Sequence, residues 1–363
     1  MSVRFCDLVI IQEKSKIKAG EGKAEGDYKF FTSSNIQTKY VDFFQYDKPG
    51  LIFGTGGIPS VHYCDEPFST STDCIVFCAK NNRYSLKSLY LFFESHMNLL
   101  EEGFHGAGLQ HISKKYILDI QIPDIPIEQQ LKINNIGNKL NSLIDIRKNQ
   151  LENYDSIVKS RFIEMFGDPI KNTMKWNTDT IEKLCSDIYG GGTPSKSHPE
   201  YYENGDILWV SSKDMKTDIL YDSQIKISSL GVDNSTTKIV PPNSVIMVIR
   251  SGILKHTLPV AINAVPITVN QDLKAFIPNE KILSVFLMSL FKMLEKDILT
   301  GVRAVTADNI EFNSLKERQI IVPPIEIQNE FATFFQETDK SKFECSITLN
   351  LLKLYNFHKH FQS

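Results

Sequence analysis

The stretch PIEQQ at residues 126–130 recurs as PIEIQ at residues 324–328, and this pair indicates an internal repeat. The copies stand 198 residues apart (324 − 126 = 198), and a long apolar pattern follows each of them. After the first copy, apolar residues recur in steps of three and four from Ile133 to Phe166, where Gly167-Asp168-Pro169 ends the pattern. We therefore predict a helix over 133–166, about 50 Å long at ~1.5 Å per residue, and a second, less regular helix from Phe331.

Three further stretches of the first half have a similar stretch in the second half, and they follow one another in the same order in both halves. Residues 26–34 resemble 205–213, residues 51–57 resemble 246–252, and Ser71-Thr72-Asp73 resembles Asn270-Gln271-Asp272. The offset grows from 179 (205 − 26) to 198, so the second copy carries about 19 more residues. Four weak matches in one order predict a duplicated unit of domain plus helix.

Each half begins with strand-like segments before its helix. In the second half, 207–210, 245–249 and 259–269 are rich in β-branched residues and bounded by turn residues, which predicts strands. We predict a mixed α/β chain with a pseudo-twofold internal repeat. Its parts are a first domain (1–125), a central helix (126–168), a second domain (169–323) and a C-terminal helix (324–363).

An apolar stripe on a helix more often belongs to a domain core than to a coiled coil. Neither half obviously needs so long a helix, so we expect the two stripes to pack together as an antiparallel coiled coil. Such a pair would act as a ruler between the two domains. The residues predicted to form the seam are Ile136, Leu140, Leu143, Leu151, Tyr154, Phe162, Phe331, Phe334, Leu349 and Leu352.

The composition of the 363 residues excludes several classes of protein. Hydrophobic residues at 42% and charged residues at 23% exclude disorder and a disulfide-dense scaffold. The longest apolar run, 282–291, is too short to cross a membrane, and no signal peptide is recognisable, so we expect a cytoplasmic protein. Because the net charge is −3, any nucleic-acid binding must come from local basic patches.

A search for catalytic motifs points away from an enzyme. The six cysteines form no C-x-x-C pair, and the chain has no P-loop, no G-x-S-x-G and no methyltransferase or nuclease signature. His111, His198 and His256 lie in polar surroundings and are better interpreted as solvated loop histidines than as general bases. We therefore predict no catalytic residues, no metal and no cofactor on this chain.

The glycine-rich stretch 190–196, GGGTPSK, is the one local candidate for phosphate binding. By itself it could equally be a flexible turn. The residues after it combine cations, hydroxyls and aromatic rings, which are the groups that contact phosphates and base edges.

Taken together, these residues resemble the specificity subunits of type I restriction–modification systems over nearly the full length. The residues that carry the resemblance are GGTPSK at 191–196, GDILWVS at 205–211, NQD at 270–272, and the PIExQ helix that ends in FGDP at 166–169. The first half departs from the pattern, having KIKAG at 16–20 in place of the glycine-rich loop.

The resemblance implies a non-catalytic DNA-recognition subunit. In that family, two target recognition domains each read one half of a split double-stranded DNA target in the major groove, and the paired helices set the spacer. The subunit docks two methyltransferase subunits, which bind S-adenosylmethionine, and restriction subunits that use ATP and Mg²⁺. The residues predicted to bind DNA are Lys16, Lys18, Lys23, Ser33, Ser34, Thr55, His105, Thr193, Ser195, Lys196, Ser211, Ser212, Lys213, Arg250, Ser251, Lys255 and Arg303.

Two other classes of function stay open at this point. The first is a self-sufficient enzyme, such as a methyltransferase or nuclease, which binding of S-adenosylmethionine by the chain alone would indicate. A structural coiled-coil scaffold would bind no DNA, and its loop cations would be incidental.

Overall fold

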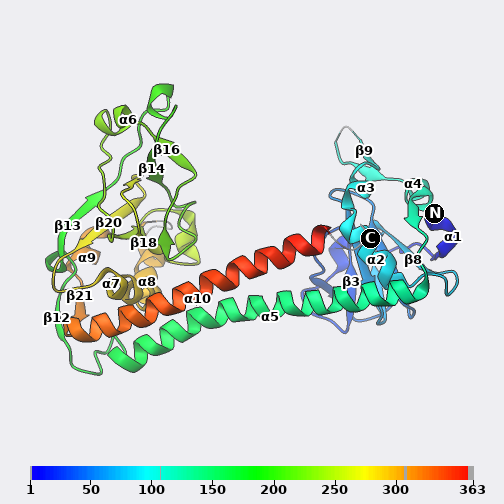
Figure 1. Cartoon of the computed structure of the whole chain (residues 1–363), viewed down its shortest axis with the longest axis horizontal. Coiled ribbons are helices and arrows are strands. Elements are labelled where there is room, and N and C mark those ends of the chain that lie inside the picture. Colours follow the sequence, from blue (N-terminus) through cyan, green and yellow to red (C-terminus); the bar gives the residue numbers. More distant parts are fainter. Residues whose placement is uncertain (1, 107, 306–308, 359–363) are drawn as a thin grey trace. The chain divides into compact units, whose positions relative to one another are not determined.

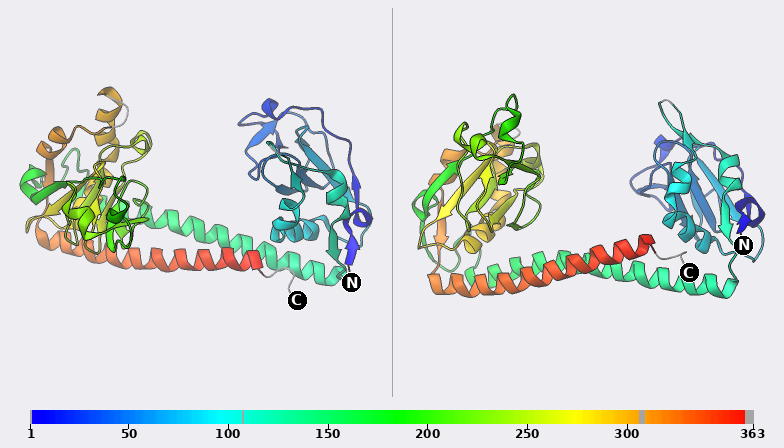
Figure 2. Two further views of the ribbon diagram at one scale, coloured as in Figure 1. Left: turned by 90° about the horizontal axis from the view of Figure 1, so that it is seen from above. Right: turned by 45° about the horizontal axis from the view of Figure 1, so that its top comes forward.

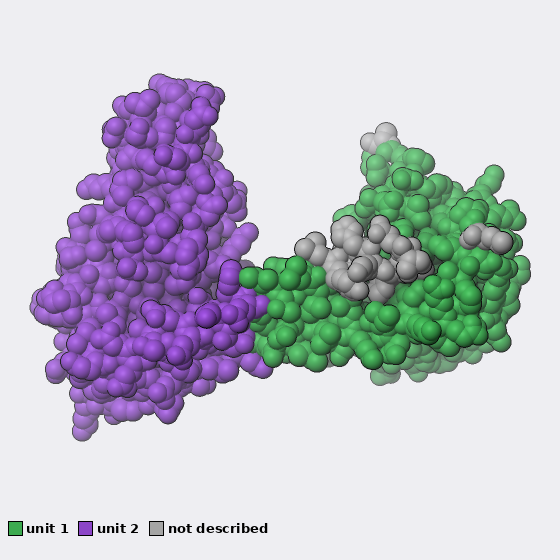
Figure 3. All heavy atoms as spheres, viewed as in Figure 1, with its two compact units in different colours: residues 1–150, 345–363 green, residues 151–344 purple. Residues whose placement is uncertain are grey.

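The computed structural model describes residues 2–106, 108–305 and 309–358. It consists of two compact units, residues 1–150 with 345–363 and residues 151–344 (Figure 3). Two long helices, α5 (Ile127–Phe166) and α10 (Ile325–His358), contribute to both units (Figures 1 and 2). None of the described helices is long and apolar enough to cross a membrane.

The domain that precedes α5, here called the first domain, is built around a four-stranded sheet of order β2-β8-β5-β6. A three-stranded sheet, β4-β3-β7, and the pairs β1-β11 and β10-β9 complete it. Its strands are β1 (Ser2–Arg4), β2 (Val9–Ile11), β3 (Tyr28–Phe31), β4 (Lys39–Val41), β5 (Gly50–Gly54), β6 (Ser60–Cys64), β7 (Phe68–Thr70), β8 (Cys74–Ala79), β9 (Phe104–His105), β10 (His111–Ile112) and β11 (Gln121–Pro123). Its helices are α1 (Phe5–Leu8), η1 (Ala19–Glu21), α2 (Leu86–Ser95), α3 (Met97–Glu101) and α4 (Lys114–Asp119).

The domain between α5 and α10, the second domain, has a five-stranded sheet of order β13-β20-β17-β18-β15. The sheet β16-β14-β19 and the pair β12-β21 accompany it. Its strands are β12 (Asn177–Thr180), β13 (Cys185–Gly190), β14 (Ile207–Val210), β15 (Ile219–Leu220), β16 (Ile225–Ile227), β17 (Val245–Val248), β18 (Val260–Asn263), β19 (Thr268–Val269), β20 (Leu273–Pro278) and β21 (Gln319–Val322). Its helices are η2 (Glu182–Leu184), η3 (Pro199–Tyr201), α6 (Ser229–Asp233), η4 (Gly252–Lys255), α7 (Ser284–Met293), α8 (Glu295–Val305) and α9 (Phe312–Glu317).

The internal repeat is confirmed sheet by sheet. β2, β8, β5 and β6 correspond to β13, β20, β17 and β18, and both small sheets have a central strand with one antiparallel and one parallel neighbour. In each domain one helix, α2 or α7, packs against the large sheet. The mixed α/β class is therefore correct, and the second domain adds one strand, β15, to the shared plan.

The predicted strands differ from the observed ones in two details. The segment 207–210 is β14 and 245–249 contains β17, but 259–269 divides into β18 and β19. The matched stretches 51–57 and 246–252 are also out of register by one residue. Gly54 of β5 pairs with Cys74 of β8 as Val248 of β17 pairs with Leu273 of β20, so Thr55 corresponds to Ile249 and not to Arg250.

Both long helices begin earlier than the apolar pattern predicts. α5 starts at Ile127 instead of Ile133, and α10 at Ile325 instead of Phe331. In each case the carbonyl of the preceding proline accepts the first helical hydrogen bond, which places the helix start directly after that proline. The apolar pattern alone omits this first turn because a polar side chain, a glutamine, faces the domain there, whereas the predicted helix segments 126–168 and 324–363 include it.

Those glutamines, Gln130 and Gln328, explain the repeated motif. Both are fully buried. The Gln130 side chain donates to the carbonyls of Arg83 and Ile125 and accepts from the amide of Ser85. That of Gln328 makes the same three bonds, donating to Lys281 and Pro323 and accepting from Leu283. One side chain thus joins each long helix to the loop before α2 or α7.

The predicted pairing of the long helices is confirmed within the second unit. The rings of Phe162 and Phe331 lie 5.5 Å apart, and Lys342 reaches Asp155 at 2.6 Å. Because residue numbers rise on α10 as they fall on α5, the helices run antiparallel. In the first unit, the thiol of Cys345 contacts the carbonyl of Arg147 at 3.6 Å.

The seam residues differ widely in burial. Phe162, Phe331, Leu140 and Leu349 are buried, whereas Leu151, Tyr154, Phe334 and Leu352 are half-buried. Ile136 and Leu143 are about half exposed, at 52% and 47%. Ile144 is buried instead, and neighbouring helical residues point about 100° apart, so Leu143 turns outward.

Candidate nucleic-acid interface

The turn between β19 and β20 of the second domain, Asn270-Gln271-Asp272, is held by its own side chains. The amide nitrogen of Asn270 donates to a carboxylate oxygen of Asp272 at 3.1 Å, and the Asp272 backbone N–H donates back to Asn270. The other oxygen of Asp272 pairs with Arg250 at 2.7 Å. One predicted DNA-binding cation is thus fixed beside this motif with about half of its side chain exposed.

The glycine-rich loop packs against the same turn. A Cβ on Gly191 would lie 2.0 Å from the carbonyl oxygen of Asn270, so only glycine fits. Gly192 donates its amide to Val269 at 3.1 Å and accepts from the indole of Trp209 at 3.0 Å. The hydroxyl of Thr193 donates to the side chain of Gln271. The loop is therefore built into the domain, and the alternative of a merely flexible turn is wrong for Gly191 to Thr193.

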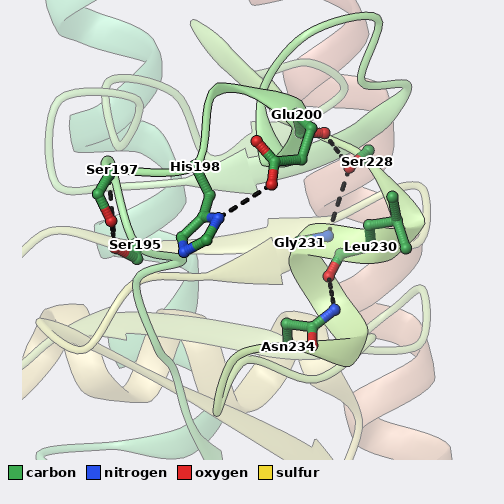
Figure 4. Close-up of polar contacts among 8 residues, drawn as sticks. All are labelled: Ser195, Ser197, His198, Glu200, Ser228, Leu230, Gly231 and Asn234. Atoms are coloured by element: carbon green, nitrogen blue, oxygen red, sulfur yellow. Dashed lines mark hydrogen bonds and ion pairs between the residues drawn. The ribbon is translucent and has the colours of Figure 1, made fainter.

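The rest of this loop carries exposed polar groups (Figure 4). Ser195 and Ser197 bond through their hydroxyls at 2.7 Å, and His198 bonds to the carboxylate of Glu200 at 2.9 Å. The hydrogen bond from His198 lowers the pKa of Glu200. Ser228 connects the loop to α6 by donating to the carbonyl of Glu200. Lys196 lies exposed between these two local contacts.

One of the two predicted serines after β14, Ser211, has a structural partner. Ser211 bonds to the carboxylate of Asp214 through both its amide and its hydroxyl, each at 2.8 Å. Ser212 is half-buried, while Lys213 is exposed. Of this group, Lys213 is the residue best placed to reach an anionic ligand.

The corresponding turn of the first domain, Ser71-Thr72-Asp73, gathers a similar polar set. The hydroxyls of Ser33 and Thr55 both donate to the carbonyl of Asp73, at 2.7 and 2.9 Å. The amide of Thr72 donates to Ile17 at 2.8 Å. The segment KIKAG therefore occupies the place that the glycine-rich loop has in the second domain, with Lys16 and Lys18 exposed beside Ile17.

The hairpin β9-β10 brings two histidines to this cluster. His105 and His111 are opposite one another in the register, and Nδ1 of His111 lies 3.1 Å from the carbonyl oxygen of Thr55. The sequence interpretation of His111 as a solvated loop histidine agrees with its exposure but did not include this contact. It also missed His62, whose Nε2 lies 2.7 Å from the carbonyl oxygen of Ser34, and whose pKa is lowered by burial.

The remaining predicted residues fall outside these two clusters. Lys23 pairs with Asp42 at 2.5 Å. Ser251 caps the 3₁₀ helix η4, in which Lys255 is exposed. Arg303 falls in α8, and its side chain lies outside the described residues. Within residues 2–106, 108–305 and 309–358, no group of three or more His, Cys, Asp or Glu side chains is arranged to hold a metal.

A family model described as type I restriction modification DNA specificity domain matches residues 1–153 and 174–350. The specificity subunit of the type I restriction enzyme EcoR124I/EcoR124II from Escherichia coli is 31% identical over 279 residues, 73% of this chain. The alignment covers 66% of that relative, just under two thirds. The MjaIX specificity subunit from Methanocaldococcus jannaschii is 24% identical over 305 residues, 79% of this chain and 69% of its own.

Two solved structures share the fold. The S subunit of a type I restriction–modification system from M. genitalium has a TM-score of 0.60 at 16% identity, covering 100% of this chain and 96% of its own. A chain from a study of complex assembly and conformational transition of the type I R-M system has a TM-score of 0.57 at 15% identity, covering 99% and 98%.

Proposed function

The chain belongs to the family of type I restriction–modification specificity subunits, and from this premise we propose that it reads a bipartite double-stranded DNA target. Each domain recognises one half-site, and the paired helices α5 and α10 set the number of base pairs between them. The chain performs no catalysis itself.

The repeated polar turn carries this proposal. Asn270-Gln271-Asp272 and Ser71-Thr72-Asp73 occupy the same place in two copies of one fold, and each collects predicted DNA-binding residues around it. The two surroundings differ in chemistry: a guanidinium and the glycine-rich loop in the second domain, and hydroxyls, lysines and a histidine pair in the first. Two similar scaffolds with different polar side chains suit a protein that reads two different half-sites.

The partners follow from the same premise. We propose that two methyltransferase subunits dock on this chain and supply S-adenosylmethionine, and that restriction subunits supply ATP hydrolysis with Mg²⁺. Exposed apolar residues on α5, among them Ile136, Leu143 and Ile157, support a protein-binding role for the helices.

A gel-shift titration across salt concentrations tests DNA binding. The triple variant Lys196→Ala, Lys213→Ala, Arg250→Ala should bind DNA more weakly. The slope of log K against log salt concentration should become shallower by roughly 0.9 for each lost phosphate contact. The control variant removes three cations that form local ion pairs elsewhere, Lys148→Ala, Lys171→Ala and Lys183→Ala. Equal retention by both variants would favour a structural scaffold. Binding of labelled S-adenosylmethionine by the isolated chain would favour a self-sufficient enzyme.

The ruler is tested separately from base recognition. Deletion of seven residues, about one heptad, from α5 should change the spacer and leave both half-sites unchanged. Methylome sequencing of cells that express the chain with its methyltransferase gives both quantities at once. Altered half-site bases would contradict the proposed division of labour between domains and helices.

A further inference from the structure

The second domain contains a strand that the first domain lacks. The large sheet ends in β6 in the first domain, whereas in the second domain β15 pairs with β18, the counterpart of β6. The added strand lies in the connection between β14 and β16, which runs from Val210 to Ile225. The matching connection of the first domain runs only from Phe31 to Lys39. Part of the extra length of the second half therefore forms β15.

The residue before β15, Asp218, joins this strand to two helices. Its carbonyl accepts from the amide of Ile262 at 2.8 Å, which fixes its backbone to the sheet. Its carboxylate lies 2.5 Å from Lys292 of α7 and 3.9 Å from Lys342 of α10. Lys342 also lies 2.6 Å from Asp155 of α5. Four charged side chains, three from α5, α7 and α10 and one from the residue before β15, thus lie close together and are here called the charge cluster.

Three of the four side chains in the charge cluster are largely shielded from water, whereas that of Asp155 is 57% exposed. The side chains of Asp218, Lys292 and Lys342 are 21%, 28% and 30% exposed. Burial opposes the charge of Lys342, but Asp218 and Asp155 outweigh it, so the pKa of Lys342 is raised. One turn earlier on α10, burial raises the pKa of Asp339, and the negative charge of Asp218 raises it further. The cluster also borders a cavity of about 270 Å³, lined on its apolar side by Val158, Phe162 and Phe335.

Apolar and charged contacts constrain the helices differently. Rings such as Phe162 and Phe331 still pack when one helix slides or tilts slightly, because apolar contacts have little directionality. A shielded ammonium group between two carboxylates is satisfied at one position only, and breaking such a set leaves an uncompensated charge. Buried polar residues in coiled coils specify register in this way, at a cost in stability.

We propose that Lys342 is a positioning residue that holds the second domain, through the β15 edge, in one alignment on α5 and α10. This inference rests on the proposed function, in which the position of the second domain fixes the distance between half-sites. Neighbouring base pairs are ~3.4 Å apart along DNA, so a shift of that size moves the second half-site by one position. Loss of the charge cluster therefore broadens the accepted spacer without changing the bases that are read.

The test is methylome sequencing of cells that express the full chain with its methyltransferase subunits. Lys342→Met should keep both half-sites, while its preference for the native spacer over spacers one base pair longer or shorter falls by about tenfold. Lys342→Arg keeps the positive charge and should restore most of the preference. The control is Lys148→Met on α5, whose ion pair with Asp145 is local and exposed, and it should leave the spacer preference unchanged.

Each outcome decides between distinct conclusions. An unchanged spacer preference in Lys342→Met overturns the positioning role, as does a change in the half-site bases. A native chain without any bipartite methylation pattern overturns the proposed function and the positioning role with it. If Lys342→Met does not accumulate as folded protein, Asp155→Asn is used. The side chain of Asp155 is 57% exposed, and asparagine has nearly the same shape as aspartate, so this variant should fold. Its spacer preference should broaden in the same direction, and unchanged preference overturns the proposal.

Discussion

The first and second domains meet the long helices through different chemistry at equivalent positions. In the first, Asn134 of α5 bonds to Ser85 and Ser88 at the start of α2, each at 3.0 Å. In the second, Phe286 of α7 takes the place of Ser88 and packs on Phe162 and Phe166, with ring centroids 5.5 and 4.7 Å apart. Hydrogen bonds specify geometry at small net energy, whereas buried rings contribute most of the stability. We therefore expect the first junction to be the more easily opened.

Removal of the ring at the second junction should have the largest effect. Phe286→Ala leaves a cavity among fully buried rings and should lower the free energy of unfolding by about 3–5 kcal/mol. Urea denaturation followed by tyrosine and tryptophan fluorescence measures this. Ser88→Ala at the equivalent position is the matched variant and should cost about 1 kcal/mol. Similar losses in both would contradict the contrast between the junctions.

The two glutamines should behave alike, since they are the part of the junction that both halves share. Gln130→Leu and Gln328→Leu each leave one amide and two carbonyls of the domain without their partner and should each cost about 2–3 kcal/mol. Hydrogen exchange at the amides of Ser85 and Leu283 reports each loss locally. Protection lost at one amide only would show that the two motifs are not equivalent.

The loops beside the polar turns should respond differently to an added methyl group. Gly191→Ala forces a Cβ against the carbonyl of Asn270 and should cost about 1–3 kcal/mol. Gly20, in the KIKAG segment of the first domain, has open space around its Cβ position, so Gly20→Ala should change stability by less than about 1 kcal/mol. Thermal unfolding of both variants makes the comparison. A neutral Gly191→Ala would mean that the loop is free to move away.

The smallest effect is expected from replacing the polar junction as a whole. Ser88→Ala with Asn134→Leu removes both partners of the Ser88–Asn134 bond and should be nearly neutral. Asn134→Leu alone takes one partner from each of two serine hydroxyls, which keep their bond to one another, and should cost about 1–2 kcal/mol. A double-mutant cycle from urea denaturation gives the coupling between the two side chains. Additive losses would show that the pair is not a unit.

The repeat, the class of fold and the helices were predictable because they depend on local patterns. The PIExQ stretch and the apolar spacing up to Phe166 survive divergence, and the same pattern appears twice. The burial of Ile144 in place of Leu143 was not predictable, since both are apolar and the partner helix decides between them. Neither was β15, a strand of two residues without a periodic signal.

The site was predictable in its motifs and less so in its individual residues. Asn270-Gln271-Asp272 stood out as a stretch, but the roles of its side chains depend on contacts from distant segments. Arg250 forms an ion pair with Asp272, and Lys23 forms one with Asp42. No local sequence pattern predicts either ion pair. His62 lies on β6 with nothing in its neighbours to indicate that it bonds to Ser34.

The short pairs β1-β11 and β12-β21 have a consequence for how such chains diversify. Each pair joins the first strand of a domain to its last, so the chain enters and leaves each domain at adjacent points. A segment whose ends lie side by side can be replaced by another with the same end spacing without disturbing the rest of the chain. Each domain thus begins and ends at one place. On the proposed function, recombination at its two paired ends would exchange one half-site and leave α5 and α10 unchanged.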